Sequence, residues 1–337
     1  ARAIAIIKAN GYGHGAVEVG KTLSPIADGF GVACIEEGLE LRESGITNPI
    51  LLLEGIFDPD ELPLVDEYRF SIAVATHQQL NWLLNSNLKQ PIDVFLKIDS
   101  GMHRLGIEPE DAKEVYTKLN ACPKVKSIVL MTHFARADEP EQPATKDQFE
   151  CFTKAVEGID APCSLSNSAG TLAHPTSHQQ FVRPGIMLYG ATPLGHTHAT
   201  DALLKPAMSL RSAIFSIRDL AVGEPIGYAG RYVCDRPTRV GVVAMGYADG
   251  YPRHAIDGTP VSIDGHSSRI IGKVSMDMLT VDLTDLPHIK EGSPVELWGN
   301  EVRANEVADC CDTISYTLFT GITRRVPLNY INHLTTI

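Results

Sequence analysis

The first part of the chain alternates short apolar runs with amphipathic segments. Six runs are long enough to form buried strands, at residues 3–7, 30–34, 49–55, 70–75, 92–99 and 125–134. They lack a regular apolar–polar alternation, which is typical of parallel strands covered on both faces. Six or more such units favour a (β/α)8 TIM-like barrel, although the pattern alone leaves a doubly wound sheet open.

Two of the segments between these runs carry helix signals. Thr76 and Gln79 have the spacing of a capping box, which predicts a helix beginning there. A second predicted helix has an apolar stripe at Phe149, Phe152, Val156 and Ile159. Strands that alternate with helices in this way predict an α/β fold.

The pattern changes near residue 200. From Met208 onward, short β-rich pieces are separated by glycine, proline and aspartate, and helical stripes are scarce until residues 305–322. The β-rich pieces cover residues 209–217, 239–245, 260–265, 268–272 and 278–283. We therefore expect a barrel domain over residues 1–204, a mainly β C-terminal domain over residues 205–337, and a linker at 196–206.

Charge and cysteine content narrow the functional class. A net charge of −12 argues against a nucleic-acid surface, which needs clustered lysine and arginine, but allows a small anionic ligand. The seven cysteines form no CxxC pair, so we expect no metal site and a reduced, cytoplasmic setting. No apolar run approaches the roughly 18 residues of a membrane span. The chain opens directly on a strand-like run without signal-peptide features, as though a leading segment were absent.

A lysine stands at the end of the first predicted strand. Lys8 precedes Gly11, Gly13 and Gly15, which allow a ligand to approach the backbone closely. Active sites of barrels lie at the carboxyl ends of strands, and a lysine kept neutral by burial can form an imine with a carbonyl cofactor. The ordinary alternative is a strand-end lysine that simply reaches solvent.

Two arginine-bearing segments offer anion-binding groups. The segment 181–190 puts Arg183 at a late strand end, with the backbone N–H groups of Gly185 and Ile186 where barrels often bind phosphate. In the segment 96–107, Arg104 lies in a strand-end loop and suits a bidentate grip on a carboxylate. The ordinary alternative for the segment 181–190 is a common turn, and that for the segment 96–107 is a cluster of surface ion pairs.

Two tyrosines stand in glycine-rich turns of the second domain. Tyr228 lies in the segment 226–232 and Tyr247 in the segment 245–253. Such tyrosines usually serve packing. Acid–base work near neutral pH would require a pKa below the ordinary value of about 10, and His133 and Arg183 are the candidate groups to lower it.

Together, and in this order, these segments resemble the alanine racemase family. The run AIIKANGYGHG at residues 5–15 is similar to the family's cofactor-lysine signature. Further matching segments include KIDSGMHRLGI, MTHFARAD, LSNSAG, FVRPGIMLYG, IGYAGRY, MGYADGYPR and GKVSMDM, and the resemblance runs from residue 5 to residue 330.

The resemblance implies an isomerase that uses pyridoxal 5'-phosphate to interconvert L-alanine and D-alanine, as a head-to-tail homodimer with shared active sites. It implies that Lys8 carries the cofactor and is the base toward one enantiomer, and that Tyr228 is the base toward the other. It assigns cofactor binding to Tyr12, His133, Ser168, Arg183, Gly185 and Ile186. It assigns substrate binding to Arg104, to the backbone of Met276 and to Tyr247, which would line the entrance.

The chain departs from the family pattern at several positions. Arg324 stands where the family often has a tyrosine that binds phosphate, and Ser275 stands where it often has cysteine. The family's residue at Lys97 is sometimes carbamylated, which the sequence allows. These positions leave the phosphate contacts and the orientation of Arg104 open.

Other functions stay open on the residues alone. A racemase of broader specificity and a related barrel decarboxylase of basic amino acids share the two-domain layout. A non-catalytic single-barrel protein that binds the same cofactor would end near residue 200 and would lack Tyr228. A barrel hydrolase without a cofactor has no carboxylate pair or metal-ligand spacing to support it.

Overall fold

The computed structural model describes residues 1–195 and 199–331. The chain divides into two compact units, one of residues 1–188 and 192–201 and the other of residues 189–191 and 202–337. The first three residues of the expected linker at 196–206 lie outside the described part of the chain. Among the helices of the described residues, none combines the length and the apolar character needed to cross a membrane.

The first unit is built on a closed barrel of eight strands, β1 to β8, each parallel to its neighbours. The strands are β1 (Arg2–Ile6), β2 (Gly29–Val32), β3 (Ile50–Leu52), β4 (Ser71–Val74), β5 (Ile92–Lys97), β6 (Val125–Met131), β7 (Cys163–Ser164) and β8 (Phe181–Val182). Pairing of β1 with both β2 and β8 closes the ring. The predicted barrel is confirmed, and the doubly wound alternative is excluded because that sheet would be open.

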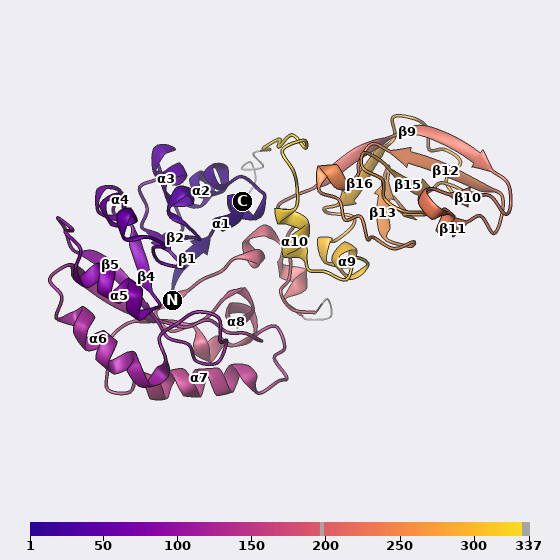
Figure 1. The fold of residues 1–337 in the computed structure, drawn as a ribbon. Coiled ribbons are helices and arrows are strands. Elements are labelled where there is room, and N and C mark those ends of the chain that lie inside the picture. Colours follow the sequence, from indigo (N-terminus) through magenta and orange to yellow (C-terminus); the bar gives the residue numbers. More distant parts are fainter. Residues whose placement is uncertain (196–198, 332–337) are drawn as a thin grey trace. The chain divides into compact units, whose positions relative to one another are not determined.

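Helices surround these strands (Figure 1). They are α1 (Lys8–Tyr12), α2 (Ala16–Leu23), α3 (Ile35–Glu43), α4 (Leu62–Tyr68), α5 (His77–Leu84), α6 (Ala112–Asn120), α7 (Ala144–Ala155) and α8 (Ser168–Ala173). The start of α5 is as expected, since the Thr76 hydroxyl accepts the N–H of Gln79 at 3.0 Å. The Gln79 side chain, however, accepts the N–H of Ala75 and not that of Thr76, so the capping box is incomplete.

The core of the first unit joins the outer faces of the strands to the helices. Its members are almost all aliphatic or phenylalanine, among them Phe30, Leu41, Leu52, Phe70 and Leu96. Phe152 of the predicted stripe is buried in this core, and Phe149, Val156 and Ile159 pack against it, the last two after α7 has ended. Burial on both strand faces explains why these strands show no polar alternation.

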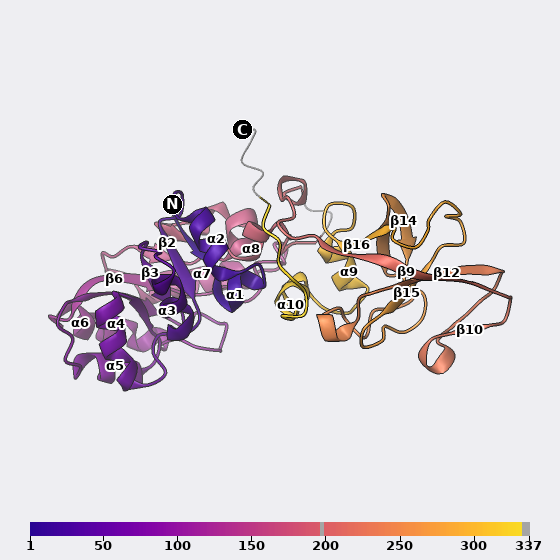
Figure 2. The ribbon, with the colours of Figure 1, turned by 90° about the horizontal axis from the view of Figure 1, so that it is seen from above.

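The second unit is mainly antiparallel β. Its six-stranded sheet has the order β14-β13-β16-β9-β12-β15, and β10 and β11 form a separate two-stranded sheet, of which Figure 2 shows β10 standing apart from the long strands β9 and β12. The strands are β9 (Leu210–Leu220), β10 (Pro225–Ile226), β11 (Tyr232–Val233), β12 (Thr238–Val243), β13 (Pro260–Ile263), β14 (His266–Arg269), β15 (Leu279–Asp282) and β16 (Pro294–Trp298).

Two short helices, α9 (Ala304–Asp309) and α10 (Ser315–Thr320), occupy the region where a late helical stripe was expected. Four of the five β-rich pieces of the sequence correspond to β9, β12, β13 and β15, and the piece at 268–272 overlaps β14 only at the last two residues of that strand. β16 was not expected, although its apolar residues lie in the middle of the sheet and Trp298 stacks on Tyr251 with ring centroids 5.8 Å apart. The predicted mainly β character of this part is confirmed.

Candidate active site

The lysine candidate follows the first barrel strand directly. Only the fully buried Ile7 separates Lys8 from β1, and Lys8 opens the short element α1. The four residues after it, Ala9, Asn10, Gly11 and Tyr12, have positive φ angles of 51°, 54°, 60° and 51°. A left-handed backbone costs about 1–2 kcal/mol per residue with a side chain, so neighbouring groups must stabilise this turn.

Several hydrogen bonds hold the left-handed turn. The N–H of Gly13 donates to the carbonyl of Ala9 at 3.0 Å, and the N–H of Gly15 donates to the carbonyl of Asn10 at 2.9 Å. The Asn10 side chain accepts the N–H of Ala16 at 2.9 Å, which connects the turn to the start of α2. The backbone conformation after Lys8 is therefore fixed at both of its ends.

A carboxylate lies beside the amine. The Lys8 Nζ and the Glu54 Oε1 are 3.4 Å apart, and both side chains are about two-thirds buried. Glu54 follows β3, and its backbone carbonyl accepts the Gln79 Nε2 at 2.8 Å. The second carboxylate oxygen of Glu54 is buried and has no hydrogen-bond partner among the described residues. Sequence reasoning missed Glu54, although it ends the apolar run at 49–55 much as Lys8 ends the first run.

Backbone and hydroxyl groups meet where β7 and β8 end. Ser168 begins α8 after β7, and its hydroxyl accepts the N–H of Gly185, after β8, at 2.8 Å. A Cβ at Gly185 would lie 2.7 Å from the hydroxyl of Tyr12, so Tyr12 would have to shift to admit a side chain there. Burial, with the charge of Glu54, raises the pKa of Tyr12 to about 12, so the phenol stays protonated and can donate a hydrogen bond. Ile186, next in the chain, is fully buried.

Arg183 and His133 form a second buried group. The Arg183 guanidinium donates to the carbonyl and the hydroxyl of Ser164 at 2.7 and 2.6 Å and to the carbonyl of Thr132 at 2.6 Å. Its Nη2 lies 3.4 Å from the His133 Nδ1. Burial lowers the pKa of Arg183 to about 10, which leaves it charged at neutral pH. Burial, followed by the charge of Arg183, keeps the pKa of His133 well below its ordinary value, so the imidazole is neutral.

The loop after β5 carries Arg104. The loop closes on itself, because the N–H of Ile107 donates to the carbonyl of Lys97 and the N–H of Asp99 donates to the carbonyl of Ile107. Gly106 permits this closure, since a Cβ there would lie 2.4 Å from the Asp99 nitrogen. Lys97 is buried, and burial, followed by the charge of Arg183, lowers its pKa to about 8. Arg104 itself is exposed.

The second unit presents its three candidate residues on exposed turns. Tyr228 begins a short 3-10 turn between β10 and β11 and is 66% exposed. Tyr247 and Met276 lie on adjoining turns, since the N–H of Tyr247 donates to the carbonyl of Ser275 at 3.0 Å and that of Ala248 to the carbonyl of Met276 at 3.0 Å. Each unit thus gathers its own candidates: the first holds eight of them at the carboxyl ends of its strands, the second three on turns.

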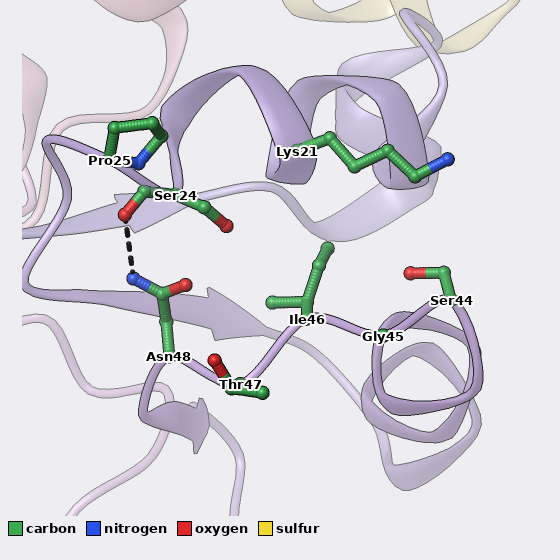
Figure 3. A pocket seen from close by; sticks show the side chains of 8 residues that line it. All are labelled: Lys21, Ser24, Pro25, Ser44, Gly45, Ile46, Thr47 and Asn48. Atoms are coloured by element: carbon green, nitrogen blue, oxygen red, sulfur yellow. Dashed lines mark hydrogen bonds between the residues drawn. The ribbon is translucent and has the colours of Figure 1, made fainter.

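A hollow of about 530 Å³ lies at the opposite end of the barrel strands from Lys8 (Figure 3). It is lined by the end of α2 and by the loop before β3, where the Asn48 side chain donates to the carbonyl of Ser24 at 3.0 Å. The loop precedes its strand, so this hollow lies at the end of the barrel that usually serves stability. Over residues 1–195 and 199–331, no three histidine, cysteine or acidic side chains are placed to hold a metal ion.

The strand-end groups of the first unit suit a phosphorylated cofactor that carries a carbonyl. The charges of Arg183, Lys97, Arg104 and Lys8 all act on the same histidine, so an anionic group is favoured there. The groups after β7 and β8 form a cradle that a side chain at position 185 would fill. The amine that can bond to a carbonyl follows β1. These features define a barrel enzyme of the pyridoxal-phosphate class.

Comparison with known proteins agrees with this class. Residues 1–193 match the family model "Alanine racemase, N-terminal domain", and residues 207–330 match "Alanine racemase, C-terminal domain". The chain is 53% identical over 331 residues to a catabolic alanine racemase of Pseudomonas putida, covering 98% of this chain and 92% of that protein. The chain therefore belongs to the alanine racemase family, whose members are isomerases that depend on pyridoxal phosphate.

Solved structures give the same result. The biosynthetic alanine racemase of Pseudomonas aeruginosa superposes with a TM-score of 0.95 at 46% identity, over 98% of this chain and 92% of that one. The alanine racemase of Acinetobacter baumannii gives a TM-score of 0.90 at 36% identity, over 96% and 91%. The matches extend through both units, which disfavours the decarboxylase, single-barrel and hydrolase functions that the residues alone left open.

Proposed function

We propose that this chain racemises alanine with two acid–base groups, the Lys8 amine and the Tyr228 hydroxyl, one on each face of the substrate. Racemisation removes the proton from Cα and returns one to the opposite face, so it needs a proton-handling group on each side. When bound, pyridoxal phosphate withdraws electrons from Cα and makes that proton removable. The observation that carries the proposal is the position of Lys8, one residue after the first barrel strand and in the same short element α1 as Tyr12, whose hydroxyl lies against Gly185.

We assign the cofactor to the cradle of the first unit. Lys8 would hold it covalently, and Tyr12, Ser168 and the backbone of Gly185 and Ile186 would donate hydrogen bonds to its phosphate. The N–H of Gly185 donates to the Ser168 hydroxyl at 2.8 Å, so the two groups lie side by side, and a phosphate oxygen would have to replace the hydroxyl as the acceptor of this N–H. Arg183, charged and held by backbone carbonyls, would face the pyridine nitrogen, with the neutral His133 against the ring.

We assign the substrate carboxylate to Arg104 and to the backbone of Met276. Arg104 is exposed on a loop whose ends are hydrogen-bonded to each other. Its guanidinium can therefore bind a carboxylate with little further loss of backbone conformational entropy. The turns that carry Met276 and Tyr247 are joined by backbone hydrogen bonds. The same pair of turns would therefore bind the substrate carboxylate, through Met276, and line the entrance to the site, through Tyr247.

We propose that the active unit is a homodimer in which Tyr228 serves the barrel of the partner subunit. Tyr228 is two-thirds exposed, and Met276, Met278 and Phe215 of the same unit are exposed apolar side chains. A partner surface that removed these apolar groups from water would gain hydrophobic free energy.

All seven cysteines lie in the described part of the chain and are free, which supports a reducing, cytoplasmic setting.

The first test is of the covalent link. Protein purified with its cofactor should show a visible absorption band that borohydride removes, and peptide mapping should then find the label on Lys8. A label on another lysine, or a protein that binds no cofactor, would contradict the assignment.

The second test separates the two bases. In the holoenzyme, Tyr228→Phe should slow deuterium exchange at Cα of one alanine enantiomer by about 10²–10⁴-fold and affect the other far less. Tyr316→Phe, on α10 of the same unit, is the control and should leave both exchanges near the wild-type rate. Equal losses for both enantiomers in Tyr228→Phe would rule out the two-base scheme.

A further inference from the structure

Glu37 makes a contact that helix capping does not explain. It lies in the first turn of α3, and its Oε2 accepts the N–H of Ala33 at 2.7 Å, a short-range bond of the kind that starts helices. Its Oε1 reaches a different segment and accepts the N–H of Ala9, 28 residues away, at 2.6 Å. One carboxylate therefore joins the ends of β1 and β2 on the side where Lys8 stands.

The bond to Ala9 falls where the backbone most needs a partner. The first N–H groups of any helical turn have no acceptor within the turn, and the turn after Lys8 is left-handed as well. Ala9 is the residue next to Lys8 and the first of the four with positive φ. A charged acceptor at 2.6 Å satisfies this N–H and fixes the peptide that joins Lys8 to Ala9.

We propose that Glu37 is a positioning residue that holds the Lys8 backbone in the orientation its amine needs, through the hydrogen bond to the N–H of Ala9. Both carboxylate oxygens are used, one for each chain segment, so the role depends on two acceptors and on the reach of the glutamate side chain. The inference rests on the proposed attachment of the cofactor to Lys8, and it adds a residue that touches neither cofactor nor substrate.

The substitution Glu37→Gln is the direct test. The amide keeps the length of the side chain but offers one acceptor oxygen, and its NH₂ group then faces a backbone N–H. We expect the equilibrium dissociation constant for pyridoxal phosphate, measured by absorption after removing and restoring the cofactor, to rise about tenfold or more, as is typical for loss of a hydrogen bond to a charged group. Deuterium exchange of the amides at residues 8–12 should become faster in the holoenzyme.

The neighbouring Glu36→Gln is the matched control, because Glu36 is exposed and lies in the same helical turn. It should leave the dissociation constant within about twofold of wild type. A purely structural role for Glu37 would instead lower the melting temperature and speed exchange within α3, without a change at residues 8–12. That result, or a cofactor affinity equal to that of Glu36→Gln, would overturn the proposal.

A second variant covers the case in which Glu37→Gln does not fold. Glu37→Asp keeps the negative charge but has a side chain one methylene shorter. We expect its carboxylate to reach the N–H of Ala33 but not that of Ala9, so cofactor binding should weaken while the amides of α3 stay protected from exchange. Normal cofactor affinity in Glu37→Asp would equally overturn the proposal. Wild-type protein is examined in parallel: failure to label Lys8 there would count against the proposed function, whereas a labelled wild type with unaffected variants would count against the role of Glu37 alone.

Discussion

The candidate residues of the two units differ in how they are held. In the barrel, Arg183, Ser168 and Tyr12 are at most 8% exposed. In the second unit, Tyr228, Tyr247 and Met276 are 66%, 36% and 52% exposed and lie on turns. The barrel thus holds these three polar groups within its own fold and leaves only Arg104 among its charged candidates exposed, whereas the β unit displays its side chains on a surface and fixes only the backbone beneath them.

The side chains of the two units are therefore restrained to different degrees. Buried polar groups in the barrel must be hydrogen-bonded, so burial itself dictates their geometry. Exposed side chains gain no such restraint and keep several rotamers. On the proposed function, the barrel would bind the cofactor largely alone, while Tyr228 would become ordered only against another surface, that of the partner subunit.

The largest effect is expected at the amine of the barrel. Lys8→Ala should reduce racemisation by about 10⁴-fold or more, because the group proposed both to hold the cofactor and to move the proton is lost. The fold should survive, since the side chain pairs only loosely with Glu54 at 3.4 Å. Turnover of each alanine enantiomer and the melting temperature are the measurements. Lys21→Ala, on the exposed face of α2, is the control; comparable activity in the two variants would contradict the role of Lys8.

A smaller effect, confined to the second unit, is expected at Gly246. A Cβ at this position would lie 2.2 Å from the carbonyl oxygen of Met276 and 2.5 Å from the nitrogen of Asp277, both backbone atoms that cannot move away independently. Gly246→Ala should therefore destabilise this unit by about 3 kcal/mol, as overpacking does, and should impair turnover while the barrel still binds the cofactor. Urea unfolding measures the loss of stability, and cofactor absorption measures whether the barrel still binds pyridoxal phosphate.

The control for Gly246 is Gly258→Ala. At Gly258 a Cβ would meet nothing within 4 Å, but φ is 96°, so this variant measures backbone strain without a clash. We expect it to cost about 1–2 kcal/mol. If Gly246→Ala is no worse than Gly258→Ala, the backbone under Met276 is not the rigid support described above.

Titration should distinguish the buried lysine of the barrel. The pKa of Lys97 is lowered to about 8 in the folded chain, from an ordinary 10.5. Between these values the unfolded chain keeps the proton and the folded chain has lost it, so stability rises as pH increases from about 8 to 10.5. Lys97→Met should remove about 3 kcal/mol of this rise, seen in the free energy of unfolding of cofactor-free protein. An identical pH dependence in wild type and variant would contradict the buried cation.

The smallest effect is expected at the phosphate cradle. Gly185→Ala would place a Cβ 2.7 Å from the Tyr12 hydroxyl, the far end of a side chain that can shift by rotation. Folding should be little affected, but the dissociation constant for pyridoxal phosphate should rise about tenfold because the Tyr12 hydroxyl, a proposed phosphate donor, is displaced. A spectral titration measures it. Unchanged affinity would place the phosphate elsewhere.

Short-range patterns made the framework of the barrel predictable. Six of its strands were predicted because a strand covered on both faces is a continuous apolar run, and Lys8 was singled out because it follows such a run. Arg183 was singled out because the segment 181–190 was interpreted as a late strand end, which is β8. β7 and β16 escaped: the first has two residues, and the second is recognisable as central only once β9 and β13 pair with it. The roles of Tyr228, Ser168 and Met276 came from resemblance to a family and not from their own surroundings.

The sequence by itself determined the alternation of strands and helices, the change to a β-rich second part and the strand-end position of Lys8, since each depends on the order of apolar and polar residues over a few positions. Only the tertiary structure decided that Glu54 and Glu37 lie beside Lys8 and Ala9, and that Arg183 meets His133. These partners are 28 to 50 residues apart. Closure of the barrel brings them together, and no local pattern records which strand ends will be neighbours.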